Sequence, residues 1–155
     1  MKSLSWQVIK QKAANLCVYR ERTVKEVSDK LSKYGLSKEE LHQIILELIK
    51  EGFIDEERYA KAFSHDKFIF HKWGKIKIRY ELQKRGLSSQ DIEVGLDVIR
   101  EEEYIEAVSE MIRSKASTIS EKDPYKLKSK IYKYMIGKGY ELDLIRNQCN
   151  TAMGI

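Results

Sequence analysis

The sequence predicts an all-α protein of three tandem three-helix modules in an elongated, curved arrangement, and three observations carry this prediction. The chain of 155 residues holds 8 glycines and 1 proline, too few for a β-sandwich with a turn about every 8–12 residues. No strand-length alternation occurs, and Phe68–Phe70 is the one short, unpaired candidate. Finally, Gly35, Gly86 and Gly139 recur at intervals of about 50 residues, which is typical of a structural repeat.

Apolar residues stand at fixed distances from the three glycines. The positions four before and ten after each glycine are apolar in every module: Leu31, Leu82, Met135, Ile45, Leu96 and Cys149. The residues before each glycine form one face of a helix that ends there, since glycine tolerates positive φ at a helix C-terminus. The residues after it form one face of the next helix, and a less regular helix precedes each pair. We place the modules at residues 1–54, 55–103 and 104–155.

Polar residues mark where the helices of module one begin. Its first helix is expected from about Leu4 to Arg20. Thr23 with Glu26, and Ser37 with Glu40, have the spacing of capping boxes, in which a hydroxyl and a carboxylate accept hydrogen bonds from otherwise unpaired N–H groups. These two pairs predict the starts of the second and third helices.

In module two the first helix is expected from Asp55 to His71, and in module three from Tyr104 to Lys115. Pro124 after Asp123 predicts another helix start in module three, because proline at the first helical position loses no hydrogen bond. The stretch from Ser114 to Lys122 has no apolar period, so we expect it to form the longest interhelical loop.

The net charge is +5, which alone indicates no particular partner. Its distribution along the chain is uneven. Arg58–Arg85 contains nine basic and two acidic residues, Gly86–Glu110 contains one basic and eight acidic, and Met111–Lys138 contains eight basic and two acidic. Basic character is therefore concentrated in modules two and three.

Basic residues repeat at helical spacing within these segments. Lys126, Lys130 and Lys133 lie on one face of a helix, apart from the core stripe that contains Ile131 and Met135. Such a face is either ordinary solvated surface or a site for a polyanion or an acidic protein surface. The candidate partner- or nucleic-acid-binding residues are Lys72, Lys75, Lys77, Arg79, Lys84, Arg85, Lys126, Lys130 and Lys133.

No arrangement of residues predicts catalysis, a metal or a cofactor. His65 and His71 are poorly spaced for one helix face, and neither a Cys-x-x-Cys pair nor a glycine-rich phosphate loop is present. Cys17 and Cys149 are expected to be free, buried thiols. Signal peptides and apolar runs of about 18 residues are absent from the sequence. We therefore expect a non-enzymatic, cytoplasmic monomer with no cofactor, no bound metal and no membrane contact.

Two segments carry a family resemblance. Residues 52–60 read GFIDEERYA, and residues 73–88 read WGKIKIRYELQKRGLS. Together with the three-module repeat, they resemble the RecX family of regulators of the RecA recombinase in DNA repair and homologous recombination. The resemblance implies a protein that binds the groove of the RecA–DNA filament, beside single- or double-stranded DNA phosphates, and limits filament growth, strand exchange and ATP hydrolysis. It also implies a structural hinge between modules formed by Gly52, Phe53, Asp55, Arg58 and Tyr59.

A second hypothesis is a helix-turn-helix protein that acts directly on duplex DNA. Three-helix units with a short turn suit such a motif, and a basic helix would serve as its recognition helix. Three tandem units without an evident dimerisation helix suit it less well, since such proteins usually read paired half-sites.

Overall fold

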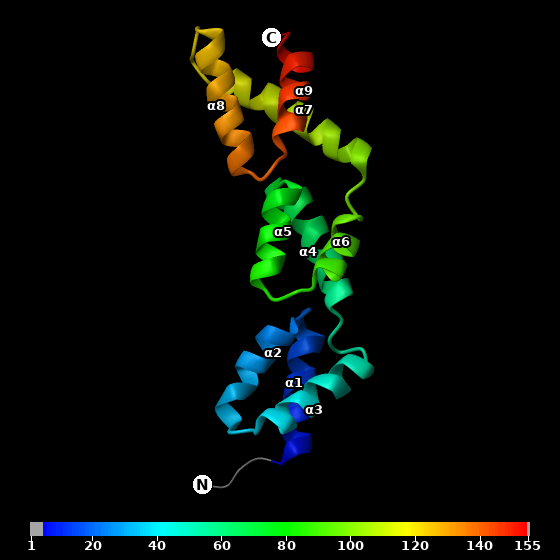
Figure 1. Cartoon of the computed structure of the whole chain (residues 1–155). Helices are drawn as coiled ribbons and strands as arrows, with labels where there is room; N and C mark the ends of the chain where they lie inside the picture. The colour runs from blue at the N-terminus through cyan, green and yellow to red at the C-terminus, as the bar shows by residue number, and fades with distance from the viewer. Residues whose placement is uncertain (1–4, 155) are drawn as a thin grey trace. The chain divides into compact units, whose positions relative to one another are not determined.

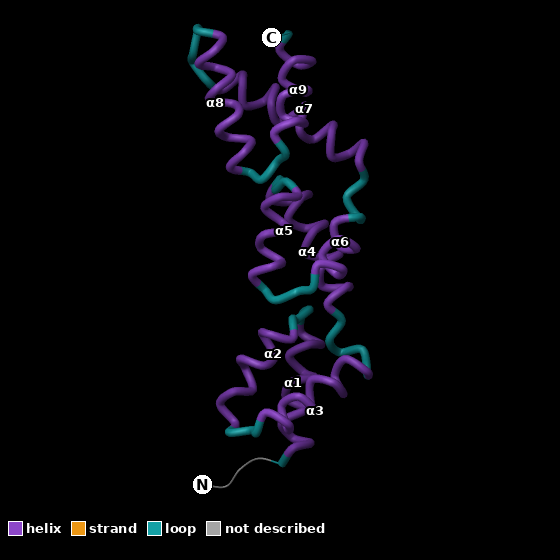
Figure 2. The backbone as a smooth tube through the Cα atoms, in the orientation of Figure 1, coloured by secondary structure: helices purple, strands orange, loops and turns teal. Residues whose placement is uncertain are grey.

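A computed structural model describes residues 5–154, and every regular element in that range is helical (Figure 1, Figure 2). Nine α-helices and one short 3-10 turn follow one another along these residues. They are α1 (Trp6–Tyr19), α2 (Val24–Leu31), η1 (Ser32–Tyr34), α3 (Lys38–Lys50), α4 (Glu56–His71), α5 (Lys75–Lys84), α6 (Ser89–Leu96), α7 (Glu101–Thr118), α8 (Pro124–Gly137) and α9 (Leu142–Met153). The all-α class and the three consecutive helix triplets are confirmed.

Local polar groups begin the helices of the first triplet as the sequence predicts. The N–H of Glu40 donates to the Ser37 hydroxyl at 3.1 Å, and the Glu40 carboxylate accepts from the N–H of Ser37 at 2.9 Å, which completes a capping box. Thr23 accepts from the N–H of Glu26 at 3.1 Å at the start of α2, but the predicted capping box is only half formed, because the Glu26 carboxylate pairs with Arg20 at 3.2 Å and Arg22 at 3.7 Å. Leu4, the expected start of the first helix, lies outside the described residues.

Pro124 begins a helix, and the three repeated glycines end helices, as the sequence predicts. Asp123 accepts a hydrogen bond of 2.9 Å from the backbone N–H two residues on, and Pro124 is the first residue of α8. Gly35, Gly86 and Gly139 have φ angles of +68°, +84° and +95°. These angles lie in the region that costs a residue with a Cβ atom conformational energy, so the repeated glycines end helices for a backbone reason.

The extent of α7 corrects two predictions. The sequence predicts the helix at Tyr104–Lys115, but three glutamates in its first turn, which favour a helix N-terminus, begin it earlier. It also continues past the start of the predicted loop at Ser114–Lys122, which shrinks to residues 119–123. The hydroxyls of Ser117 and Thr118 donate back to carbonyl oxygens three residues earlier, at 2.7 and 2.8 Å, so the last turn closes without apolar residues.

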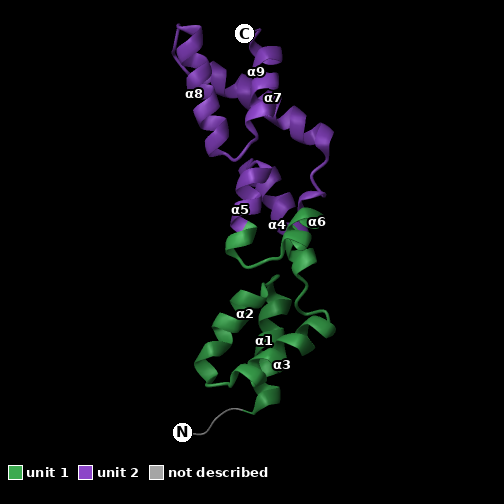
Figure 3. Ribbon diagram, in the orientation of Figure 1, with its two compact units in different colours: residues 1–60, 82–95 green, residues 61–81, 96–155 purple. Residues whose placement is uncertain are grey.

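The chain divides into two compact units by packing (Figure 3). Unit 1 comprises the chain up to Ala60 together with Leu82–Gly95, and unit 2 comprises Lys61–Glu81 together with the chain from Leu96 onward. The division passes through α4 and α5, so it follows packing rather than the repeat. The module boundaries expected from the repeat remain predictions.

Each unit has its own buried apolar residues. In unit 1 the helices α1, α2 and α3 pack on one another around Ile9, Ala13, Val27, Leu31, Ile44 and Leu48. In unit 2 the helix α7 packs against α8 and α9, and the residues that are fully buried include Ile78, Val108, Ile112, Ile131, Met135, Ile145 and Cys149. No helix within residues 5–154 is long and apolar enough to cross a membrane.

Candidate partner-binding surface

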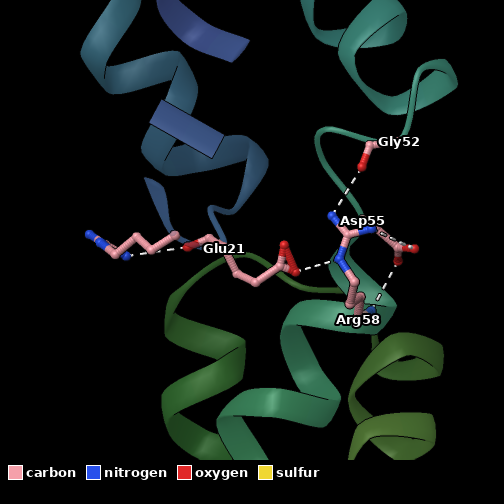
Figure 4. Close-up of polar contacts among 5 residues, drawn as sticks. Glu21, Gly52, Asp55 and Arg58 are labelled. Carbon is pink, nitrogen blue, oxygen red and sulfur yellow. Dashed lines mark hydrogen bonds and ion pairs between the residues drawn. The ribbon is translucent and has the colours of Figure 1, made fainter. Parts of the chain in front are cut away.

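The segment that carries the family signature is tied together by Arg58 in unit 1 (Figure 4). Its guanidinium donates to the carbonyl oxygen of Gly52 at 3.0 Å and to the carboxylate of Glu21. Asp55 accepts from the backbone N–H of Arg58 at 3.0 Å and so caps the start of α4. Arg58 thereby links the turn after α3 to the segment before α2.

The other signature residues are also engaged within unit 1. Gly52 has a φ of +81°, Phe53 is half-buried against the core, and Tyr59 is buried. Ala60 is fully buried against α6, where a Cβ atom on Gly95 would lie only 2.5 Å from its own. Small residues at both positions let the two helices approach closely. The geometry gives these residues an architectural place, and their role as a hinge remains a prediction.

Two interhelical turns cross in unit 2, and glycines permit the crossing. The N–H of Gly74 donates to the carbonyl of Lys138 at 2.7 Å, and the N–H of Ile76 donates to that of Gly139 at 3.0 Å. A Cβ atom on Gly74 would lie 2.3 Å from the Gly139 carbonyl oxygen, and one on Gly139 would lie 2.3 Å from the Cβ of Lys77. We call this contact between residues 72–77 and 138–140 the turn crossing.

Two buried tyrosines support the turn crossing. The Tyr104 hydroxyl accepts from the N–H of Lys75 at 2.9 Å and donates to the Glu141 carboxylate. The Tyr140 hydroxyl donates to the carbonyl of Lys72 at 3.0 Å, and its ring lies 5.2 Å from that of Tyr104. Burial raises the pKa of both tyrosines, which keeps the hydroxyls protonated as donors. Glu141, the residue before α9, makes no capping hydrogen bond with its side chain and instead accepts from the Tyr104 hydroxyl.

Three lysines, at positions 72, 77 and 138, lie beside the turn crossing. Lys138 donates from Nζ to the carbonyl of His71 at 2.9 Å. Burial, with the neighbouring charges of Lys77 and Lys72, lowers the pKa of Lys138. Lys72 has a φ of +56° and is the one non-glycine residue with positive φ within residues 5–154. Lys72 and Lys77 are among the residues predicted from the sequence, whereas Lys138 is not, because its glycine neighbours indicate only a helix end.

An aromatic ring joins this basic group. The half-buried Trp73 has the Nζ atoms of Lys77 and Lys67 at 4.6 and 4.9 Å from its ring centroid. The His71 ring lies 6.1 Å away at a tilt of 53°. Lysine ammonium groups at such distances are attracted to the ring by cation–π interaction. We name the whole group the Trp73 cluster: Lys67, His71, Lys72, Trp73, Lys77 and Lys138.

An acidic hollow borders the cluster at Lys72. It has a volume of about 550 Å³ and lies in unit 2 against α4 and α7. Its apolar lining comes from Phe68, Ile69 and Ala107. Its acidic lining comes from the glutamates at positions 102, 103, 106 and 110. Four glutamates of the acidic segment predicted from the sequence thus line a hollow shared with Lys72.

The remaining predicted residues lie in separate places. Lys75 has its Nζ atom 4.8 Å from the Tyr104 ring centroid, and Arg79 is half-buried on α5. Lys84 and Arg85 belong to unit 1, where they line a hollow of about 380 Å³ that also contains basic and acidic residues of the segment around α2. The nine predicted residues are therefore not assembled into one continuous ridge within either unit.

The lysine ridge of α8 has the orientation expected from its spacing. Lys126, Lys130 and Lys133 are all exposed, whereas Ile131 and Met135 on the other face are fully buried. One member of the ridge has an acidic neighbour, because the Nζ of Lys130 lies 3.8 Å from a carboxylate oxygen of Glu121. The ridge is thus a largely unshielded basic surface.

Metal binding and thiol reactivity have little support among residues 5–154. No group of three or more histidine, cysteine or acidic side chains could hold a metal ion within this part of the chain. Cys17 and Cys149 are both buried free thiols, and burial raises the pKa of each, which disfavours the nucleophilic thiolate.

Each of the three helix triplets matches one domain of a known protein family. Residues 10–48 match the first, residues 55–96 the second and residues 101–147 the third three-helix domain of RecX. A regulatory protein RecX of Clostridium botulinum (strain Alaska E43 / Type E3) is 34% identical over 134 residues, which cover 85% of this chain and 62% of that protein. Its counterpart in Clostridium acetobutylicum is 33% identical over 123 residues, covering 77% and 56%. The chain thus spans only about three fifths of the length of these relatives.

Solved structures share the fold. The crystal structure of RecX from Lactobacillus salivarius superposes with a TM-score of 0.89 at 23% identity and covers 97% of both chains. A second crystal structure, of a regulatory protein RecX, has a TM-score of 0.77 at 19% identity and covers 90% of this chain and 72% of that one. With its three helix triplets matched in order by the three RecX domains, the chain belongs to the RecX family.

Proposed function

We propose that the chain regulates the RecA recombinase by binding the groove of the RecA–DNA filament, where it limits filament growth, strand exchange and ATP hydrolysis. The observation that carries the proposal is the match of all three RecX domains between residues 10 and 147. This role requires no catalytic residue and no cofactor, and it would place a monomer in the cytoplasm with the recombinase.

Charge supports a filament as the partner. DNA phosphates attract clustered lysines and release counterions when they bind. The exposed ridge of Lys126, Lys130 and Lys133 and the Trp73 cluster are the two basic surfaces of unit 2 best placed for this contact. Lys75, Arg79, Lys84 and Arg85 remain proposed contacts that lie outside these two surfaces.

ATP hydrolysis by RecA on single-stranded DNA tests the proposal directly. Substoichiometric amounts of the chain should slow hydrolysis, because one bound molecule would block growth of a whole filament end or groove segment. An unchanged rate at equimolar protein would contradict the proposal. Sequence-specific binding of naked duplex DNA, with no effect on RecA, would instead favour the helix-turn-helix alternative.

Charge reversal tests the α8 ridge. Replacing Lys126, Lys130 and Lys133 by Glu should weaken filament binding and reduce its salt dependence by about 0.7–0.9 in log–log slope for each phosphate that the variant no longer neutralises. The matched control reverses three exposed lysines of unit 1, Lys12, Lys30 and Lys38, which lie outside both basic surfaces. Equally weakened binding in the two triple variants would show that only net charge matters.

A further inference from the structure

We propose that the Trp73 cluster binds single-stranded DNA, with Lys72, Lys77 and Lys138 on its phosphates and the Trp73 ring against a base. This inference deepens the proposed function and rests on it, since the RecA filament would supply such a strand.

The first support is the charge of the cluster. Within residues 5–154, no carboxylate oxygen lies within 4.0 Å of the ammonium groups of Lys72, Lys77 or Lys138. Their crowding is visible in the lowered pKa of Lys138, to which the charges of both neighbours contribute after burial. A bound oxyanion would relieve this repulsion, so the cluster favours an anionic ligand. Glutamates line the hollow beside Lys72, so we expect a phosphate to contact Lys72 from the side away from that hollow.

The second support is the rigidity of the backbone that carries the lysines. The turn crossing fixes Lys77 and Lys138 through the hydrogen bonds of Gly74 and Ile76 and through the close glycine contacts. The carbonyl of Lys72 is held by the Tyr140 hydroxyl. The backbone positions from which the lysine side chains extend are therefore set before any ligand arrives, which reduces the entropy lost on binding.

The third support is the aromatic ring, which selects the kind of polyanion. Proteins that bind single strands combine a basic track for the backbone with aromatic rings on which unpaired bases stack. Trp73 is half-buried, and the ammonium groups of Lys67 and Lys77 lie against it only through weak cation–π contacts. When these groups move to phosphates, a ring surface becomes available to a base. An acidic protein surface would use the lysines but would leave the ring unused.

Intrinsic fluorescence tests the inference. The chain has 2 tryptophans, Trp6 and Trp73, so Trp6→Phe leaves Trp73 as the sole reporter. Titration of this variant with oligothymidylate should change its fluorescence saturably. Adding Lys72→Glu, Lys77→Glu and Lys138→Glu should weaken the affinity at least tenfold and lower the salt slope by about 2, at about 0.7 for each single-strand phosphate. The Lys12, Lys30 and Lys38 reversal serves as the control and should leave the affinity within about twofold.

Three outcomes would overturn the inference: no fluorescence change with oligothymidylate, an affinity unaffected by reversal of the cluster, or an equal response to polyglutamate at the same ionic strength. If the triple reversal unfolds the protein, the milder Lys→Gln changes at the same positions should still weaken binding without altering the circular dichroism spectrum. The RecA assay separates the two proposals. A cluster variant that no longer binds the oligonucleotide yet inhibits RecA as well as the parent would contradict the DNA-binding site and leave the regulatory function intact. Binding of the oligonucleotide by the parent without any effect on RecA would support the site and contradict the regulatory function.

Discussion

Replacement of Gly74 by alanine tests whether the turn crossing stabilises unit 2. The new Cβ atom would lie 2.3 Å from the carbonyl oxygen of Gly139, whereas ordinary contacts begin at 3.4 Å. The two turns would therefore have to part by about 1 Å, since a close-packed interior offers no room for overlap. Such a shift would stretch the 2.7 Å hydrogen bond from Gly74 to Lys138 beyond the bonding range and weaken that from Ile76 to Gly139.

The cost follows from the groups that would be left without partners. A buried donor or acceptor left unsatisfied costs about 1–3 kcal/mol, and reduced freedom of the unfolded chain returns about 0.4–1 kcal/mol for a glycine-to-alanine change. Loss of the bond from Gly74 to Lys138 leaves two such groups, so we expect Gly74→Ala to lower the free energy of unfolding by about 1–5 kcal/mol, measured by urea denaturation followed by circular dichroism.

Gly137 provides the matched control for this change. It ends α8 only two residues before Gly139, yet a Cβ atom there would meet no other atom within 4 Å. Gly137→Ala should therefore leave the protein equally stable or stabilise it by up to about 1 kcal/mol, because alanine favours the helix. Equal urea midpoints for the Gly74 and Gly137 variants would refute the role assigned to the turn crossing.

Three further predictions concern Arg58, the buried tyrosines and the thiols. Arg58→Ala should lower the free energy of unfolding by about 1–2 kcal/mol because two hydrogen bonds are removed, whereas Arg100→Ala should change it by less than about 0.5 kcal/mol because its ion pair is exposed. In an alkaline titration followed by tyrosinate absorbance, Tyr104 and Tyr140 should remain protonated above the ordinary pKa of 10.0. The unfolded chain releases these protons first, so stability should fall as the pH rises above that value. Both cysteine thiols should react slowly with a thiol reagent until urea unfolds the chain, since burial raises the pKa of each.

Equal destabilisation by the Arg58 and Arg100 changes would show that the guanidinium contacts contribute nothing specific. Ionisation of all 9 tyrosines in one step near the ordinary pKa, with the helical signal intact, would contradict the buried network. Rapid modification of both thiols in the native protein would mean that their surroundings open readily.

The helix triplets were predictable because their signals are local. Ser37 and Asp123 cap helices through neighbours within three residues, and Gly139 ends one through its own φ angle. The end of α7 was not predictable from apolar periodicity. Hydroxyl-to-carbonyl bonds close its last turn, and the Nζ of Lys115 lies 4.3 Å from the Tyr134 ring of α8.

The candidate surface was predictable only in part, because charge can be read from sequence but proximity cannot. Lys72 and Lys77 were identified from the basic segment, and the α8 lysines from their spacing. Lys138 joins them only through the turn crossing, where its ammonium group meets a carbonyl 67 residues earlier in the chain. Nor does the sequence mark Glu141 as the partner of Tyr104, because the two residues lie 37 positions apart.

The turn crossing also limits how freely the repeats can be exchanged. Tandem modules invite the view that each could be deleted, duplicated or expressed alone. Yet the first N–H groups of α5, in the second RecX domain, find their acceptors in the third, at Lys138, Gly139 and the Tyr104 hydroxyl. A replacement third domain would fit only if it brought a glycine and a tyrosine to these positions. The third domain should therefore be kept together with Lys61–Glu81 of the second domain in any truncation or chimera.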